Sequence, residues 1–580
     1  MNIRVITIKK GQFVYWPFFI ALILLSVYYF RFNNELCIID DYGLFKKLSQ
    51  SQLNNIVSSF IYNAKSGLYY RPLTSLTYKI EYLFFKDNPI FYYFDNLLIF
   101  FITILFYYKI LRRILNDDFF VFSSLLIFCV NPLAVESVAW ISGRTDLLAL
   151  MFLTIGFYFL FEYALLQKLY YLFLSLTFML LATLSKETAS MFVLAIPLFI
   201  TSKETLKKIK NKKLIITLSI LLVILFLGFF LILREISFVN NSKKIYMTIK
   251  FIINNPEFAT MKFFRLIGFY IKKLIIPWPL NLTIESVDPL YDLIGVLIVI
   301  LAIYLFFKNT LINRFFVIGL CFLLPAYPIS FGQIAWTPYA ERYALISSMF
   351  IYPFILFYIV NFVNNRNLYK KIYIFFMSIV IIIFGITSHS RAKIWSNNIS
   401  LLQDVTNKNP EFQDGWRLLG LAYHLNNDLD KAEKYYLQAK KIGSFVYNYK
   451  LDEDLGVLYL QKKQYDLALG YFYNILKHKS GRHKLAKQAI FEVYVKMLIN
   501  ATNSNAQKLL EKRIDLFYEE NKKILDDAHI LYKLGKYFLN KKNKQYALKY
   551  LKIAHQKFKP ESRYKNITKS IIKNINKFYN

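Results

Sequence analysis

Residues 169–202 have the sequence LYYLFLSLTFMLLATLSKETASMFVLAIPLFITS, in which two apolar runs flank a charged pair, Lys186 and Glu187. A helix needs about 20 apolar residues to cross a bilayer, with roughly 17 to 25 allowed. The runs 169–184 and 188–202 come close to that length. Similar runs recur along the chain as far as residue 388. This stretch therefore predicts a polytopic membrane protein built from helices.

The composition supports a membrane assignment for most of the chain. The 580 residues are 56% hydrophobic with a mean hydropathy of +0.35, which is too apolar for a string of soluble domains. Beyond residue 388 the apolar residues are interspersed with Lys, Asn, Asp and Glu. We therefore expect a membrane domain over residues 1–390 and a soluble domain over residues 391–580.

About eleven segments are candidate membrane spans by length and composition. They centre on residues 13–30, 90–110, 119–133, 146–164, 169–184, 188–202, 214–232, 290–307, 315–331, 343–362 and 372–388. The first is expected to be a retained span, because it lacks the small-residue cleavage site of a signal peptide. Residues Met261 to Ile276 are apolar but contain Arg265, Lys272 and Lys273, so we predict a helix lying at the membrane interface there.

Positive residues beside the spans indicate the orientation, because Lys and Arg near span ends are retained in the cytoplasm. Alternation through eleven spans places every basic loop inside: Arg4 with Lys9 and Lys10, Arg112 with Arg113, the lysines between 203 and 213, Lys308 with Arg314, and Arg366 with Lys370 and Lys371. Residues 31–89, 134–145, 185–187, 233–289 and 332–342, and everything after 388, then lie outside. We expect an integral protein of a bacterial inner membrane with an extracytoplasmic C-terminal domain.

The net charge of +35 does not indicate nucleic-acid binding. The lysines lie between apolar runs, where they act as stop signals and contact the anionic headgroups of membrane lipids. The sequence also lacks a basic recognition module. Cys37, Cys129 and Cys321 are far apart and form neither a disulfide framework nor a metal-binding spacing. Membrane lipids, and no nucleic acid, are therefore expected partners.

A repeat begins at Gly415 with GWRLLGLAYHLNNDLDKAEKYYLQA, which has the residue spacing of a tetratricopeptide repeat. The matching residues are Trp416, Leu419, Gly420, Tyr423, Ala432, Tyr436 and Ala439; then Leu455, Gly456, Tyr459, Ala468 and Phe472; then Leu534, Gly535, Phe538, Ala547 and Ala554. Residues 485–498 and 506–518 fit a degenerate copy. An α-solenoid of this kind usually holds a protein or peptide on its concave face. The alternative is a spacer or an oligomerisation element.

Five charged strings fall in the loops expected outside the membrane. They are Asp40-Asp41, Tyr70-Arg71-Pro72-Leu73-Thr74, NPLAVESVAWISGRTDLLALMF from Asn131, LSKE from Leu184 and AERY from Ala340, and Arg391 and Trp395 follow the last span. Two adjacent carboxylates can supply a general base or a metal ligand, although an acidic pair in a loop is more often solvated or caps a helix. The loops therefore gather groups suited to proton transfer and to anion binding on one side.

These strings together resemble a family of membrane O-mannosyltransferase-like proteins, which join a multi-span domain of the C-type (GT-C) glycosyltransferase superfamily to tetratricopeptide repeats. The resemblance runs from about Asp40 to Ala439, and the family pattern is matched at Pro132, Glu136, Val138 to Arg144, and Asp146 to Leu147. A His often precedes that Pro in the family, whereas this chain has Asn131. Any role of that His is not transferred.

The resemblance implies an all-α, GT-C-like glycosyltransferase with a sugar donor carried on a polyprenyl phosphate or pyrophosphate. It also implies an acceptor outside the cytoplasm, either protein or glycan, and a catalytic base in the first outer loop. We expect Asp41, and after it Asp40, to be that base. The repeats would then position the acceptor or bind a protein partner.

Transfer of the sugar also needs cations that stabilise the departing phosphate. The candidates for binding substrate or phosphate are Arg71, Glu136, Arg144, Lys186 and Arg342, of which we expect Lys186 and Arg342 to meet the phosphate. The alternative is purely structural pairing of Lys186 with Glu187, Arg342 with Glu341, and Arg144 with Asp146. No cofactor is predicted, and a divalent metal on the carboxylates is left open.

Two other classes of protein stay as alternatives. A transporter of lipid-linked glycans needs ionisable residues in mid-membrane, whereas Asp95 and Glu162 lie near span ends. A scaffold that only tethers the repeats needs no charged outer loops, yet Asp40, Asp41 and Lys186 are present.

Overall fold

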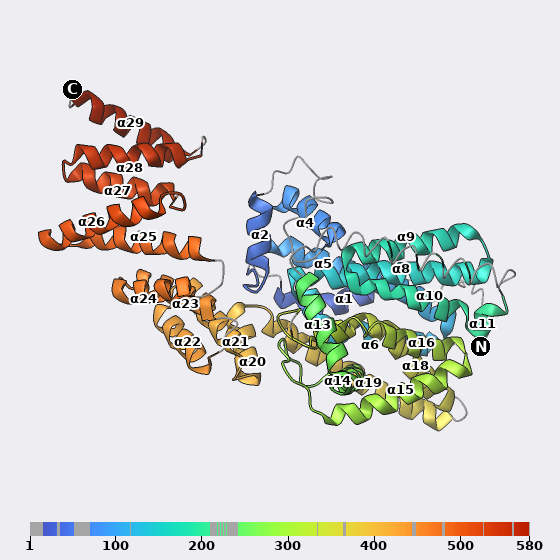
Figure 1. Ribbon diagram of the computed structural model, residues 1–580. Coiled ribbons are helices and arrows are strands. Elements are labelled where there is room, and N and C mark those ends of the chain that lie inside the picture. The colour runs from blue at the N-terminus through green and yellow to red at the C-terminus, as the bar shows by residue number, and fades with distance from the viewer. Residues whose placement is uncertain are drawn as a thin grey trace. The chain divides into compact units, whose positions relative to one another are not determined.

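The computed structural model describes most of the chain as helices (Figure 1). The described residues are 15–31, 35–50, 70–115, 118–208, 242–332, 334–363, 367–443, 448–477, 482–525, 527–559 and 562–578, with single positions at 217, 221, 224 and 228. Within these ranges the backbone is helical or irregular, apart from one isolated bridge between Ile284 and Tyr339. The prediction of an all-α protein is confirmed.

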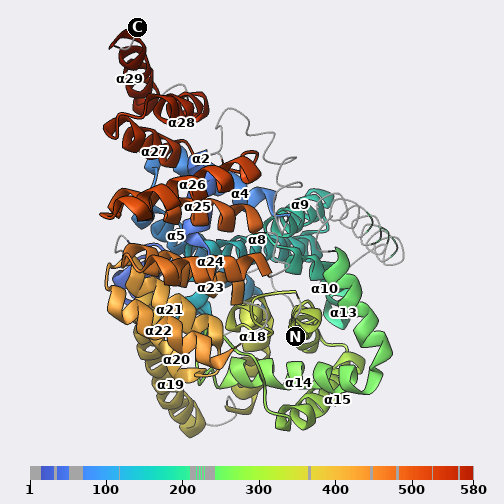
Figure 2. The ribbon, with the colours of Figure 1, turned by 60° about the vertical axis from the view of Figure 1, so that its left-hand side comes forward.

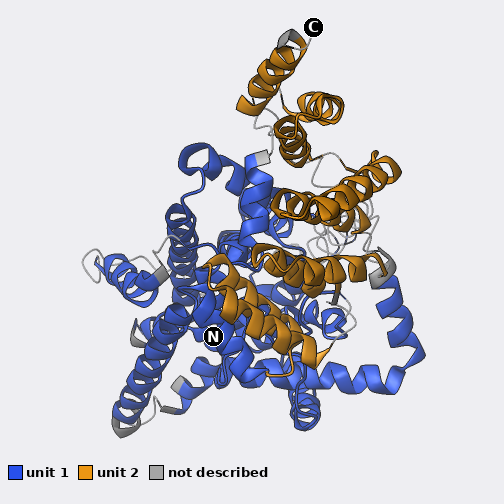
Figure 3. Cartoon of the chain, turned by 90° about the vertical axis from the view of Figure 1, so that its left-hand side faces the viewer, with its two compact units in different colours: residues 1–409 blue, residues 410–580 orange. Residues whose placement is uncertain are grey.

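The chain divides into two compact units, Met1–Asn409 and Pro410–Asn580 (Figure 3). The first contains α1 (Trp16–Tyr28), α2 (Asp41–Gln50), α4 (Pro72–Phe85), α5 (Pro89–Ile114), α6 (Asp118–Cys129), α7 (Val135–Ala139), α8 (Arg144–Leu166), α9 (Leu169–Ser185), α10 (Phe192–Ile200), α11 (Lys203–Leu206), α13 (Ser242–Asn254), α14 (Pro256–Ile275), α15 (Leu290–Lys308), α16 (Leu311–Cys321), α17 (Ala326–Ile329), α18 (Leu345–Val363), α19 (Asn367–Ile394) and α20 (Asn398–Lys408). The composition change near residue 390 thus falls inside α19.

Seven helical segments of the described chain are long and apolar enough to cross a membrane. They are Pro89–Ile114, Phe120–Ala139, Ile141–Leu166, Leu290–Lys308, Leu311–Ile329, Glu341–Ile359 and Lys371–Ile394. Three further expected spans coincide with shorter apolar helices, Trp16–Tyr28, Leu169–Ser185 and Glu187–Ile200. The predicted span at 214–232 lies outside the described residues except at four positions. The chain is therefore an integral membrane protein by these helices, and the count of eleven stays a prediction.

Glycines allow the membrane helices to approach closely. A Cβ atom on Gly156 of α8 would lie 2.8 Å from the Met179 side chain of α9. Cβ atoms on Gly268 of α14 and Gly295 of α15 would overlap the backbone of the opposite helix. Small residues commonly permit such crossings between membrane helices.

Helix α14 contains the apolar segment predicted to lie at the interface, and its cations have partners in the protein. Arg265 forms two hydrogen bonds of 2.8 Å with Asp292 of α15. Lys273 is buried and pairs with Glu341 at 2.7 Å. These contacts pair two of the cations in an otherwise apolar helix, and α14 is not among the seven long apolar segments.

The two ends of the helical bundle carry different loops. Helices α2 and α4 lie at one end and α11 at the other (Figure 1). At the α11 end, the Lys203 N–H donates to the Asn309 carbonyl at 2.8 Å, and the Leu311 N–H donates to Glu204 at 2.7 Å. The basic loops that begin at Lys203 and Lys308 therefore share one end, away from the acidic pair.

The described residues of the second unit form four helix pairs and a last helix (Figure 2). The pairs are α21 (Gln413–Leu425) with α22 (Leu429–Ile442), α23 (Asn448–Gln461) with α24 (Tyr465–Lys477), α25 (His483–Asn500) with α26 (Ser504–Asn521), and α27 (Ala528–Asn540) with α28 (Lys544–Lys557), followed by α29 (Arg563–Phe578). In three pairs a glycine of the first helix faces a large side chain sixteen positions later: Gly420 faces Tyr436, Gly456 faces Phe472 and Gly535 faces Leu551. The spacing found in the sequence is thus repeated in the packing.

Candidate active site

The two carboxylates of the acidic pair, Asp40 and Asp41, have different surroundings. Asp41 is fully buried at the start of α2, whereas Asp40 is exposed. Oδ1 of Asp41 accepts hydrogen bonds from the Ser142 N–H at 3.1 Å and the Ser142 hydroxyl at 2.6 Å. Its Oδ2 accepts from the Cys37 N–H at 3.3 Å. Asp41 therefore fixes the segment internally, and Asp40 is the carboxylate at the surface.

Residues 136–146, called the hub segment below, connect most of the candidate side chains. The segment runs through α7 and the short 3-10 helix Ile141–Gly143 into the first turn of α8. Gly143 permits this compact path, because a Cβ atom there would lie 2.6 Å from the Ser137 carbonyl oxygen. Its φ angle of −67° is ordinary, so the need for glycine is one of space.

Four charged side chains form an alternating row along the hub segment. Arg342 forms an ion pair with Glu136, and its Nε lies 3.9 Å from Asp146. Lys186 forms an ion pair with the other oxygen of Asp146. The Arg342 guanidinium also lies 5.3 Å from the centre of the Trp140 ring. The row joins loops from three regions of the chain, with equal numbers of positive and negative groups.

The pairings suggested by sequence proximity are wrong. Glu187 pairs with Arg71 through two hydrogen bonds of 2.9 and 2.7 Å, and Lys186 takes Asp146 as its partner. Glu341 pairs with Lys273, which leaves Arg342 to Glu136. Adjacent residues of a 3-10 turn or helix end point in different directions, so neighbours in the sequence reach different partners.

Exposure distinguishes the two cations of this row, Arg342 and Lys186, and the nearby Arg71. The side chains of Arg71 and Arg342 are 21% and 19% exposed, whereas that of Lys186 is 5% exposed. Burial lowers the pKa of the Lys186 ammonium below its usual value, Asp146 opposes this effect, and the guanidinium groups of Arg71 and Arg342 reinforce it. The two arginines are therefore the cations that a ligand can reach.

Arg144 is enclosed by the protein. It is fully buried, forms an ion pair with Glu81 of α4, and donates to Asn96 at 2.8 Å and to the Tyr92 carbonyl at 2.9 Å. Its guanidinium also lies 4.6 Å from the centre of the Tyr78 ring. These contacts differ from the pairing with Asp146 that the sequence suggested, and they tie the hub segment to α4 and α5.

Two tryptophans close to the row keep their indole N–H groups without a hydrogen-bond partner within the described residues. Trp140 and Trp395 are both buried, and their ring centres are 6.1 Å apart. Buried donors are normally paired. In the same part of the chain, no group of three His, Cys, Asp or Glu side chains is arranged to hold a metal ion.

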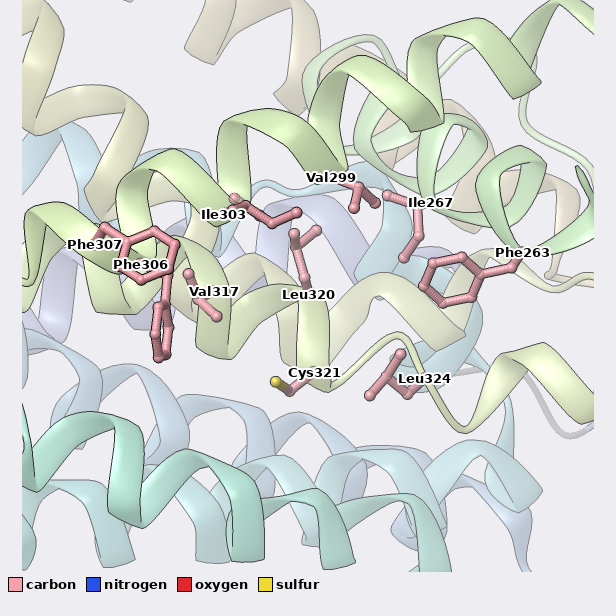
Figure 4. A pocket seen from close by; sticks show the side chains of 11 residues that line it. Phe263, Ile267, Val299, Ile303, Phe306, Phe307, Val317, Leu320, Cys321 and Leu324 are labelled. Atoms are coloured by element: carbon pink, nitrogen blue, oxygen red, sulfur yellow. The ribbon is translucent and has the colours of Figure 1, made fainter. Parts of the chain in front are cut away.

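An apolar cavity lies between α14, α15 and α16 (Figure 4). Its volume is about 380 Å³, and it is lined by Phe263, Ile267, Val299, Ala302, Ile303, Phe306, Phe307, Val317, Leu320, Cys321 and Leu324. Helix α14 connects this cavity to the charged row. Further along it, Tyr270 bonds to Ala340 and Lys273 to Glu341, directly beside Arg342.

The sequence identified the four charged side chains of the row, and Arg71, Glu187 and Arg144 beside it, but not Ser142, Glu81 and Asn96. Ser142 lies inside the quoted string, two residues from Arg144. A serine in a loop carries no signal of its own, because its role depends on Asp41, 101 positions away.

Comparison with known protein families gives a match within the first unit. The family model described as dolichyl-phosphate-mannose-protein mannosyltransferase matches residues 72–232, a range that includes the hub segment and Lys186. No curated protein matches the chain. The matched range excludes the acidic pair, Arg342 and the helix pairs of the second unit. Residues 72–232 are thus similar to the dolichyl-phosphate-mannose-protein mannosyltransferase family, and this similarity indicates a glycosyltransferase of the GT-C type.

Proposed function

We propose that this protein transfers a sugar from a polyprenyl-phosphate-linked donor to a hydroxyl group of an extracytoplasmic acceptor. The observation that carries the proposal is the meeting of the acidic segment and Arg342 at the hub segment, with Arg71 held nearby by Glu187, the neighbour of Lys186. Asp41 bonds to Ser142, and Arg342 lies over Trp140, two residues away. The matched family's description names a lipid-linked mannose donor and a protein acceptor, which makes mannose and protein the first substrates to test.

In the proposed reaction, a carboxylate takes the proton of the acceptor hydroxyl while the hydroxyl oxygen forms a bond to the anomeric carbon of the sugar. The bond from that carbon to the phosphate oxygen breaks, and the polyprenyl phosphate leaves with the electron pair. General bases and fixed positive groups lower the barrier to such a step. The step needs no oxidant or reductant.

Burial favours Asp40 over Asp41 as the base, which is the opposite of the order expected from the sequence. The Asp41 carboxylate is enclosed and accepts three hydrogen bonds, whereas Asp40 is exposed. A base must come within hydrogen-bond reach of the acceptor hydroxyl. We therefore assign the proton transfer to Asp40 and the positioning of the segment to Asp41.

Exposure also favours Arg342 and Arg71 as the groups that bind the donor phosphate. Arginine presents a fork of donors that matches phosphate oxygens. Lys186 lies beneath them and holds Asp146, which in turn lies 3.9 Å from Arg342. The apolar cavity along α14 would take part of the polyprenyl chain, because the same helix leads to Glu341 and Arg342.

For the second unit, we assign the four helix pairs to tetratricopeptide repeats that position the acceptor. The support is the glycine spacing repeated in three pairs. The alternative is a non-enzymatic scaffold, which would need the repeats but would have no use for the charged row.

One assay tests these assignments together. Purified full-length protein and a variant ending at Asn409 are incubated with polyprenyl-phosphate mannose that carries a labelled sugar, with and without protein acceptors from the native membrane. We expect the full chain to label an acceptor, and the shortened chain to bind or slowly hydrolyse the donor with little transfer. Absence of donor binding, hydrolysis and transfer in both proteins would contradict the enzyme assignment and favour the scaffold.

A further inference from the structure

Asn398 forms a clasp that joins α20 to the segment immediately before the acidic pair. Its side-chain Oδ1 accepts from the Ile38 N–H at 2.9 Å. Its Nδ2 donates to the Leu36 carbonyl at 2.8 Å and to Glu35 Oε1 at 2.5 Å, and its backbone N–H donates to the same oxygen at 2.9 Å. The amide therefore pairs with Leu36 and Ile38 as a neighbouring strand would, and Asn398 is only 6% exposed.

The other contacts of this segment place Asp40 between two fixed points. The Tyr93 hydroxyl donates to the Glu35 carbonyl at 2.9 Å from α5. On the far side of Asp40, the Asp41 carboxylate is held by Ser142. Asn398 fixes Ile38, two residues before Asp40, so the backbone that carries Asp40 is held on both sides.

Helix α20 has its own anchors, which are independent of Asn398. Asp404 pairs with Arg391 at 2.6 Å, and Lys408 donates to the Leu280 carbonyl at 2.6 Å. Asn397 caps the helix by accepting from the Ser400 N–H at 2.8 Å. Loss of the Asn398 amide should therefore loosen the acidic segment while α20 keeps its place within the first unit.

We propose that Asn398 is a positioning residue for the catalytic carboxylate, acting through the 35–38 segment and touching neither substrate. This inference rests on the proposed function, since it gives Asp40 its task. A misplacement of about 1 Å at a reacting group can cost on the order of a hundred-fold in rate. Because the four contacts involve the segment and not the arginines, the loss should appear in kcat and spare the binding of the donor.

The test compares Asn398→Asp with Asn397→Asp in the full-length protein. The aspartate at 398 loses both donated hydrogen bonds and meets the Glu35 carboxylate, whereas Asn397→Asp keeps the helix cap and has no bond to residues 35–38. We expect Asn398→Asp to lower kcat by about ten- to hundred-fold with the donor KM within about twofold, and Asn397→Asp to behave like the parent. The double variant Glu35→Gln/Asn398→Asp should recover part of the rate, because the amide introduced at position 35 can donate to the carboxylate introduced at position 398 in place of the bond that Asn398 donated to Glu35, while the Leu36 carbonyl stays without its donor. Asn398→Ala provides a second loss of the clasp without added charge.

Hydrogen exchange separates this inference from the proposed function. The rate of amide exchange at residues 35–41 should rise in Asn398→Asp and in Asn398→Ala. In the double variant it should fall back toward the rate of the parent protein, whether or not transfer is detected. An unchanged kcat in variants with raised exchange would overturn the positioning role. A fall in kcat that matches a loss of folded protein, without recovery in the double variant, would overturn it as well. If the parent protein performs no transfer, the proposed function fails while the exchange data still decide whether the clasp exists.

Discussion

Adjacent acidic residues can divide structural and chemical roles between them, and we propose that Asp40 and Asp41 do so. Asp41 is buried with three hydrogen bonds to its carboxylate, and Asp40 is exposed. Replacement by Asn preserves size but removes the ability to take a proton. The two positions should therefore respond differently to the same change.

We predict that Asp40→Asn lowers transfer by about a hundred- to ten-thousand-fold while donor binding survives, as expected for loss of a general base. Asp41→Asn should instead lower the thermal stability of the purified protein, by about 1–3 kcal/mol for a buried group left with a mismatched partner. Sugar transfer, donor binding and thermal unfolding are measured on the same preparations. Near-normal transfer by Asp40→Asn would remove it as the base.

The proposed contact between Arg342 and the donor phosphate can be tested by mutation. Removal of its charge leaves Glu136 buried without its partner, so the informative variant is Arg342→Gln combined with Glu136→Gln. We expect this double variant to raise the donor KM by about tenfold or more, because a forked cation that contacts phosphate is lost. Lys86→Gln serves as the control, since Lys86 is an exposed cation at the other end of α4 from Arg71. Equal, small effects of both changes would make Arg342 purely structural.

At the scale of elements, the sequence predicts helices well and their partners poorly. Apolar runs of span length and repeat spacing depend on neighbours in the chain, so ten of the eleven expected spans coincide with apolar helices. Ion pairs and buried side-chain hydrogen bonds, by contrast, depend on residues far apart in the chain. Lys186 reaches Asp146 across 40 positions, Arg342 reaches Glu136 across 206, and Asn398 reaches Ile38 across 360. A list of charged residues can therefore be read from the sequence, but the pairing follows only from the packed helices.

The proposed binding of the polyprenyl chain in the cavity between α14, α15 and α16 can be tested by filling the cavity. Ala302 lines it, and Ala302→Phe would fill part of its volume of about 380 Å³. We expect the KM for a long-chain polyprenyl donor to rise several-fold, with no change for a donor whose chain is too short to enter. Leu297→Phe, at an exposed position of the same helix, is the matched control. A similar rise for both donors would place the polyprenyl chain elsewhere.

The repeated glycines of the second unit lead to a prediction about the packing of its helix pairs. A Cβ atom on Gly420 would lie 2.5 Å from the Tyr436 ring, so Gly420→Ala must displace that ring or separate α21 from α22. Overpacking of this kind typically costs about 1–3 kcal/mol. Limited proteolysis of the full chain should then cleave within residues 410–443 sooner than in the parent, whereas Gly470→Ala, with open space around its Cβ position, should change nothing. Equal resistance of both variants would argue against tight packing of this pair.

At the scale of the whole molecule, the distribution of charge speaks against a transport path through the described membrane helices. Glu162 pairs with Arg113 at 2.5 Å, and Asp95 lies 3.5 Å from Arg144, so both acids near span ends have structural partners. A transporter would be expected to place ionisable groups along a mid-membrane route. The charges instead concentrate around the hub segment, as a site for chemistry at one end of the bundle requires.

The orientation of the chain is the last prediction, and it determines whether the proposed donor and acceptor can meet. Lys and Arg beside the spans assign the loop after Lys203 to the cytoplasm and the acidic segment to the other side, and α2 and α11 lie at opposite ends of the first unit. Reporter fusions after Asn211 and after Tyr579 should therefore report opposite compartments. A fusion after Asn309 should agree with the one after Asn211, because the Lys203 N–H bonds to the Asn309 carbonyl. If the fusions after Asn211 and Tyr579 report the same compartment, the number of crossings between them is even, and the repeats cannot share a side with Asp40 in the way that transfer to an acceptor held by them requires.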